Sequence, residues 1–160
     1  MDAATLAAVV AVFGPALFKV LEKLADKGVV EPTLEPLTRQ IKAWATGDYD
    51  KKKAEADLLK VMQASLPSES EDVKLFFAFS DLKSKPDLAA KVAAAVIEMT
   101  SEAESSIRPD LLGDLKLDDS HRRALAAALF SLRKNLAESE TYRVGIEYAN
   151  DLDRSGLLRE

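Results

Sequence analysis

The chain of 160 residues contains no cysteine and only one histidine, His121. Without cysteine there can be no disulfide framework, no thiolate metal site and no cysteine nucleophile. A single histidine excludes most zinc sites and most catalytic triads, because both depend on that side chain. The net charge of −5 argues against a nucleic-acid-binding protein, since such proteins present a basic face.

Strand-forming residues and helix breakers are also scarce. Val, Ile and Thr total 21 residues and Gly and Pro six each, whereas the chain has 25 Ala and 23 Leu. Ala and Leu favour helices, whereas β-branched residues favour strands. The composition therefore predicts an all-α fold, a compact bundle of about seven helices forming one domain over 1–160.

The first helix is expected over 2–27, with Gly28 as its stop signal. Pro15 lies inside it, so we expect either a kink near Gly14 or a break into two pieces. A second helix is expected over 32–47, and a third begins at Asp48 or Asp50 and runs to Leu66. The apolar residues expected on the inward faces of the second and third helices are Leu34, Leu37, Ile41, Trp44, Leu58 or Leu59, Met62 and Leu66.

The clearest joint in the chain is Pro67 with the polar run 68–71, which would separate sub-bundles 1–66 and 68–160. Ser68 and Glu71 have the spacing of a capping box, which predicts a fourth helix over 72–83. Large apolar side chains occur nearly all round that helix, so we expect it to be central. These side chains are Val73, Phe76, Phe77 and Phe79.

Three more helices are expected in the C-terminal half. The fifth restarts at 84–87, a short turn opens at 108–110, and a loop begins at Gly113. Asp118 or Asp119 caps the sixth helix and Ser139 caps the seventh. The inward stripes expected for these helices are Leu88, Val92, Val96 and Met99, then Leu125, Leu129, Leu132 and Leu136, then Tyr142, Ile146 and Ala149.

The run 3–18 carries no charged side chain, whereas a surface helix normally shows charge at each turn. It is expected to be a core helix, or a helix released to a membrane or an oligomer interface. A signal peptide fits poorly because no basic residue precedes the run, and sixteen residues fall short of the roughly 20 needed for a permanent span. The side chains proposed to meet a membrane or a partner are Leu6, Val9, Val10, Val12, Phe13, Leu17 and Phe18.

Motifs for catalysis are missing from the chain: there is no P-loop, no GxGxxG, no HExxH and no GxSxG. His121 follows Asp118 and Asp119, so it is either a proton-transfer residue held by a carboxylate or an exposed residue among capping acids. We favour the second interpretation, and we expect no catalytic residue, cofactor or metal.

Two charged clusters have a functional and a plain interpretation. Glu98 and Glu102 share a helix face and could bind a divalent ion, but a solvated face explains them. Lys51, Lys52 and Lys53 oppose the helix macrodipole, and they could contact an anionic surface such as lipid headgroups. The i,i+4 spacing of these lysines to following acids predicts a solvated, internally compensated patch instead.

The opening MDAATLAAVVAVFGPALFKVLEKL and the later segments LFSLRKNL (129–136), ETYR (140–143) and IEYAN (146–150) carry a family resemblance. The chain resembles the helical N-terminal domains that precede the nucleotide-binding module of bacterial NACHT-type STAND ATPases. Its first helix is similar to that of HeLo-type cell-death domains, which targets membranes. In the STAND family the ATPase senses an invader and oligomerises, and the N-terminal domain acts as effector or adaptor.

The resemblance implies a non-enzymatic effector or signalling domain of innate antiviral defence that acts by self-association. Its partners would be further copies of itself and other proteins, and membrane lipid if the first helix inserts, with no nucleic acid. It would reside in the cytoplasm and reach the inner membrane on insertion. The alternative is a plain protein-interaction adaptor whose first helix stays buried. Leu157 and Leu158 begin an apolar pattern at the last residues, so we expect the chain to be an N-terminal fragment of a longer protein.

Overall fold

The computed structural model describes residues 2–27, 39, 43, 50–67, 72–99 and 104–154. Within these ranges all regular secondary structure is helical, which confirms the predicted all-α fold. The expected helix at 32–47 lies outside the described residues, apart from Arg39 and Ala43, which are helical. The elements in chain order are α1 (Ala3–Lys27), α3 (Lys51–Ser65), α4 (Val73–Ser80), η1 (Asp81–Lys83), α5 (Pro86–Glu98), η2 (Glu104–Ser106), α6 (Pro109–Leu115), α7 (Asp119–Glu138) and α8 (Arg143–Arg154).

Aspartate residues start four of these helices in the same way. Asp2, Asp50, Asp72 and Asp118 each precede a helix, and each accepts a hydrogen bond at Oδ1 from the backbone N–H three residues later. The N···O distances are 2.7, 3.1, 3.1 and 3.0 Å. These bonds satisfy amide donors that the helix itself leaves without partners. The predicted caps at Asp50 and Asp118 are therefore confirmed.

α1 is one continuous helix although Pro15 lies inside it, so the predicted break into two pieces is wrong. A proline disfavours helical geometry in the preceding residue, partly through a clash with that residue's Cβ. Gly14 has no Cβ and therefore escapes this part of the clash. It also lies against α3, where an added Cβ would be 3.5 Å from Cδ2 of Leu58.

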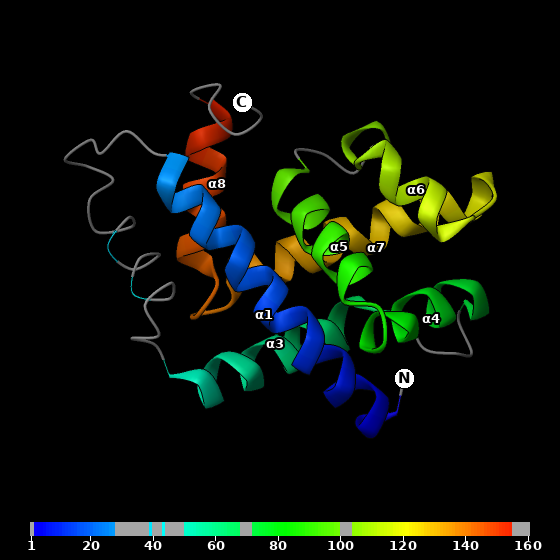
Figure 1. Cartoon of the computed structure of the whole chain (residues 1–160), viewed down its shortest axis with the longest axis horizontal. Helices are drawn as coiled ribbons and strands as arrows, with labels where there is room; N and C mark the ends of the chain where they lie inside the picture. Colours follow the sequence, from blue (N-terminus) through cyan, green and yellow to red (C-terminus); the bar gives the residue numbers. More distant parts are fainter. Residues whose placement is uncertain are drawn as a thin grey trace.

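A single hydrophobic core joins the helices on both sides of Pro67. α1 packs against α5 and α3, α3 packs against α7, and α7 packs against α8. Figure 1 shows α1 running diagonally across the molecule, crossing α3 in its lower half and with α5 beside it. The largest fully buried side chains come from both ends of the chain, and they include Phe13, Leu58, Ile97 and Tyr148.

Hydrogen bonds of buried and partly buried side chains tie α3 to the C-terminal part of the chain. The hydroxyl of Tyr142 is buried and donates to the carbonyl oxygen of Ala54 at 2.9 Å. The amide Nδ2 of Asn135 donates to Oγ of Ser65 at 2.7 Å. These bonds link residues 70 or more positions apart in sequence, so they fix how α3 sits against α7 and the start of α8.

α4 is peripheral, and the predicted central position is wrong. Leu75 and Phe79 are buried, whereas Val73 is 54% exposed and Phe77 is 56% exposed. α4 has only eight residues, and its packing against α1, α7 and η1 covers one side of it. A short helix with large apolar side chains all round therefore leaves some of them in water.

Three helix boundaries differ from the prediction. The fourth helix ends early, because residues 81–83 form the 3₁₀ turn η1. Its N-cap is Asp72, and the predicted capping box of Ser68 and Glu71 lies outside the described residues. Gly113 does not begin a loop, because α6 continues to Leu115 and ends where Lys116 takes a left-handed conformation with φ 51°. Ser139 ends α7 rather than capping α8, because its backbone N–H bonds to the carbonyl of Leu136.

Candidate functional site

The seven side chains proposed to meet a membrane or a partner point toward the core. Leu6, Val9, Val10, Phe13 and Leu17 are at most 5% exposed. The two others, Val12 and Phe18, are half-buried and pack against the same core. The ring of Phe18 lies 5.7 Å from that of Tyr142 in a tilted arrangement. In this structure these seven side chains form the inner side of α1, and their movement to a membrane stays a prediction.

The outer face of α1 is made of small residues, namely Ala3, Ala4, Ala7, Ala11 and Pro15, all of which are exposed. Because 3–18 has no charge, this exposed face is uncharged for about four helical turns. The inner and outer sides of α1 therefore differ in the size of their side chains rather than in their polarity. The sequence contains this signal, since large and small apolar residues alternate with helical spacing over 3–18.

A shallow groove of about 270 Å³ adjoins this outer face, between α1 and α3. Its apolar lining comes from Ala7, Val10 and Ala11 of α1 and from Ala56 and Leu59 of α3. Two charged side chains of α3, Lys52 and Glu55, complete its lining. The outer face and the groove together form a mostly apolar surface, which we call the α1 surface.

Among the described helices, α1 alone is long and apolar enough to cross a membrane, over Ala3–Leu24. Core helices of soluble proteins and signal sequences share this property. Length and composition therefore do not separate a membrane role from a core role, whereas the burial of the large side chains favours the core role.

The three lysines at the start of α3 are exposed. Nζ of Lys53 lies 2.8 Å from Oε1 of Glu140, and this hydrogen bond raises the pKa of the lysine. The acid four positions after Lys53, Asp57, accepts a hydrogen bond from Oγ1 of Thr141 at 2.5 Å. Lys53 is thus compensated from outside its helix, and Lys52 lines the groove beside α1.

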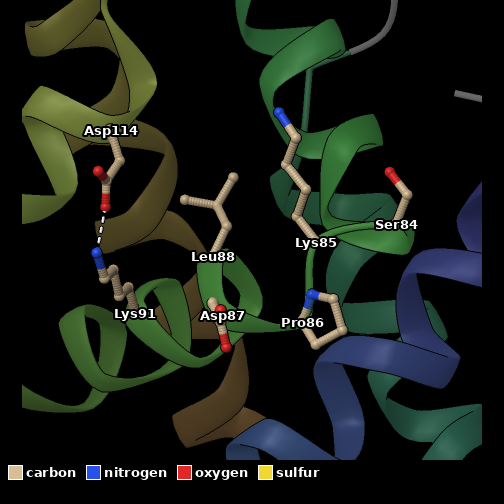
Figure 2. A pocket seen from close by; sticks show the side chains of 7 residues that line it. All are labelled: Ser84, Lys85, Pro86, Asp87, Leu88, Lys91 and Asp114. Atoms are coloured by element: carbon tan, nitrogen blue, oxygen red, sulfur yellow. Dashed lines mark hydrogen bonds and ion pairs between the residues drawn. The ribbon is translucent and has the colours of Figure 1, made fainter.

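A second depression, of about 480 Å³, lies at the start of α5 and is shown in Figure 2. Both of its lysines are paired: Lys91 of α5 reaches across to Asp114 of α6 (Figure 2), and Nζ of Lys85 is 3.2 Å from Oδ2 of Asp81. The bond to Asp114 raises the pKa of Lys91. A raised pKa keeps the ammonium protonated, which is the opposite of what an amine nucleophile needs.

His121 lies in the first turn of α7 and is half-buried. Its Nδ1 is 2.7 Å from Oδ1 of Asp118, so the carboxylate contact considered in the sequence is present. A second carboxylate, that of Asp72, lies on the other side of the ring. Sequence spacing could not indicate this contact, because Asp72 comes from α4, 49 positions away.

The described part of the chain contains no group of three or more His, Cys, Asp or Glu side chains placed to hold a metal ion. Glu98 lies at the end of α5 and is half-buried, whereas Glu102 is outside the described residues. The acidic pair considered in the sequence therefore remains a prediction. Comparison with known proteins gives no match to any family model, curated protein or solved structure.

Proposed function

We propose that the chain is a non-enzymatic helical effector or signalling domain that acts by associating with further copies of itself. The observation that carries this proposal is the α1 surface: a helix on the outside of the bundle is uncharged from Ala3 to Phe18. Charged side chains on such a face would favour solubility. Their lack over four turns suits a surface that another helix covers.

A second copy of the chain fits this surface. Two copies can lay their small-residue faces against each other without burying a charge, and alanine allows close approach of helix backbones. The same patch would serve both subunits, as in a two-fold symmetric contact. The groove between α1 and α3 extends this contact area beyond a single helix face.

The biological role of this association rests only on the resemblance to STAND ATPases. We propose that a downstream sensor raises the local concentration of the domain in bacterial antiviral defence. Weak contacts between domains then become a stable assembly through the high effective concentration. This part of the proposal predicts that the isolated domain associates weakly.

A membrane-directed form of this function would require α1 to leave the bundle. In lipid the large side chains of α1 would again be in an apolar environment, so their own transfer does not oppose release. What opposes release is the core surface of α3 and α5 that α1 covers, because this surface would be left in water. We infer that the rest of the bundle must rearrange or unfold when α1 leaves, which favours association through the outer face with α1 kept in place.

Sedimentation velocity over a range of concentrations tests the proposal, using Ala11→Glu on the α1 surface and Ala127→Glu on α7 as a matched control. Both alanines are exposed, so both variants should fold like the unsubstituted chain by circular dichroism. We expect Ala11→Glu to weaken association by about tenfold or more, because a charge would be buried in the contact, and Ala127→Glu to leave it unchanged.

Three outcomes would contradict the proposal or redirect it. A chain that stays monomeric at all accessible concentrations would contradict self-association. Equal association of the two variants would place the contact elsewhere. Sedimentation with anionic liposomes that is lost in a folded Val10→Asp variant, but kept in Ala127→Glu, would instead favour the membrane form.

A further inference from the structure

The imidazole ring of His121 lies between the capping carboxylates of two different helices. Its Nδ1 is 2.7 Å from Oδ1 of Asp118, which caps α7, and its Nε2 is 3.4 Å from Oδ1 of Asp72, which caps α4. The side chains of His121 and Asp72 are each 24% exposed, so water competes only in part for these contacts. Each ring nitrogen thus faces a group that, when ionised, can only accept a hydrogen bond.

A neutral imidazole cannot satisfy both contacts. It carries one N–H and one lone pair. With the proton on Nδ1, the Nε2 lone pair faces Asp72; with the proton on Nε2, the Nδ1 lone pair faces Asp118 at 2.7 Å. Only the protonated ring carries an N–H on both nitrogens, so only this form donates to Asp118 while it presents an N–H and a positive charge to Asp72.

The charges around the ring also favour a cation there. Nζ of Lys74, from α4, lies 3.0 Å from Oδ2 of Asp118, and hydrogen bonds from His121 and Lys74 hold the pKa of Asp118 well below its usual range. Asp118 therefore stays ionised throughout the range in which histidine titrates. On the same turn of α7, Asp119 lies 3.6 Å from Arg122. The carboxylates offset the positive end of the α7 dipole, which alone would disfavour a cation at this position.

We propose that His121 is a proton-dependent link between α4 and α7. Protonated, it bridges the two helix caps; after losing the proton it keeps one contact, and its lone pair opposes the other carboxylate. Leu75 and Phe79 are the buried side chains of α4 and the ion pair of Lys74 with Asp118 also joins α4 to α7, so this link adds to the few contacts that hold the start of that helix. A rise in pH therefore loosens the helix that exposes Val73 and Phe77, independently of any contact made by α1.

The experiment is a double-mutant cycle between His121→Gln and Asp72→Asn, measured by urea unfolding at pH 5.5 and pH 8.5. Asn is as good an N-cap as Asp, so Asp72→Asn removes the charge and keeps the start of α4. At pH 5.5 we expect a coupling of about threefold to fivefold in the unfolding equilibrium constant, the size typical of a partly exposed charge pair. At pH 8.5 the coupling should fall to less than about twofold, because loss of the ring proton removes the charge that attracts Asp72.

A hydrogen-exchange measurement gives a second, local readout. Protection of the α4 amides, compared with those of α1, should fall between pH 5.5 and pH 8.5 in the unsubstituted chain and change little in Asp72→Asn. This comparison also keeps the test decisive if His121→Gln fails to fold. Zero coupling at pH 5.5, coupling that is equal at both pH values, or the same α4 profile in both proteins would each overturn the proposal.

Discussion

α1 and α4 are both apolar on nearly every side in sequence, yet the bundle uses them in opposite ways. α1 turns large side chains such as Phe13 and Leu17 into the core and leaves alanines in water. α4 buries Leu75 and Phe79 but leaves Phe77 exposed. The same overall apolarity thus produces a packed helix with a smooth outer face in one case and a peripheral helix with exposed large side chains in the other.

The difference follows from how side-chain size is distributed around each helix. Large residues of α1 recur every three or four positions, so one side of the helix can bury nearly all of them. In α4 four large residues fall within five positions, and neighbours contact only one side. Size periodicity is therefore a better guide to the buried face than the mean apolarity of a helix.

The largest expected difference in stability is between two Phe→Ala variants, one in α1 and one in α4. Phe13→Ala should lower the free energy of unfolding by about 3–5 kcal/mol, because it leaves a cavity in a fully buried position. Phe77→Ala should change it by less than about 1 kcal/mol, since that residue is 56% exposed. Urea unfolding of both variants measures the contrast, and equal losses would mean that the two helices are buried alike.

Pro15→Ala should raise the free energy of unfolding of the protein by about 1–3 kcal/mol. Position 15 is exposed, so alanine meets no neighbour there, and it restores the backbone N–H that proline lacks. Thermal unfolding by circular dichroism measures the gain. A loss of stability would show that the helix depends on the geometry that proline imposes, and that the outer face is not free to change.

Tyr142→Phe tests how the inner side of α1 is supported. The Tyr142 ring packs on Phe18, and its hydroxyl donates to the buried carbonyl oxygen of Ala54. Phenylalanine keeps the ring but leaves that carbonyl without this donor, which should cost about 1–2 kcal/mol in urea unfolding. A neutral result would indicate that water reaches the carbonyl, and that the α3 contact is looser than described.

The smallest effect is expected from Asp118→Asn, and it should be confined to the region of α4. Asn keeps the α7 cap but loses the charge that pairs with Lys74 and His121. Because the pKa of Asp118 is lowered in the fold, its contribution is present near neutral pH and fades as the pH falls below about 4.

The comparison of Asp118→Asn with the unsubstituted chain is made by urea unfolding at pH 7 and pH 3. Their difference in stability should shrink at pH 3, while hydrogen exchange in α1 should not distinguish the two proteins. A difference that is as large at pH 3 as at pH 7 would show that the lost contribution is not electrostatic.

Local signals in the sequence predicted much of this fold. The caps at Asp50 and Asp118, the stripe from Leu125 to Leu136 and the extent of α1 follow from neighbouring residues, because they depend on helix geometry alone. What could not be predicted depends on contacts distant in sequence. The second carboxylate at His121, the bond from Lys53 to Glu140 and the peripheral place of α4 all arise only when the bundle is assembled.

The continuity of α1 through Pro15 shows a different limit. Proline alone predicts a kink or a break, but its neighbour Gly14 relieves part of the clash, and both lie in a helix packed against α3 and α5. Tertiary packing thus overrode a local preference for a break.

Amide hydrogen exchange of residues 3–18, measured with and without anionic liposomes, tests most directly whether α1 belongs to the core. We predict that the amides from Leu6 onward, the first to bond within the helix, exchange only through global unfolding, at the same rate whether or not lipid is present. Exchange of 3–18 through a separate opening while α5 and α7 stay protected, or a change in its protection caused by lipid alone, would contradict it.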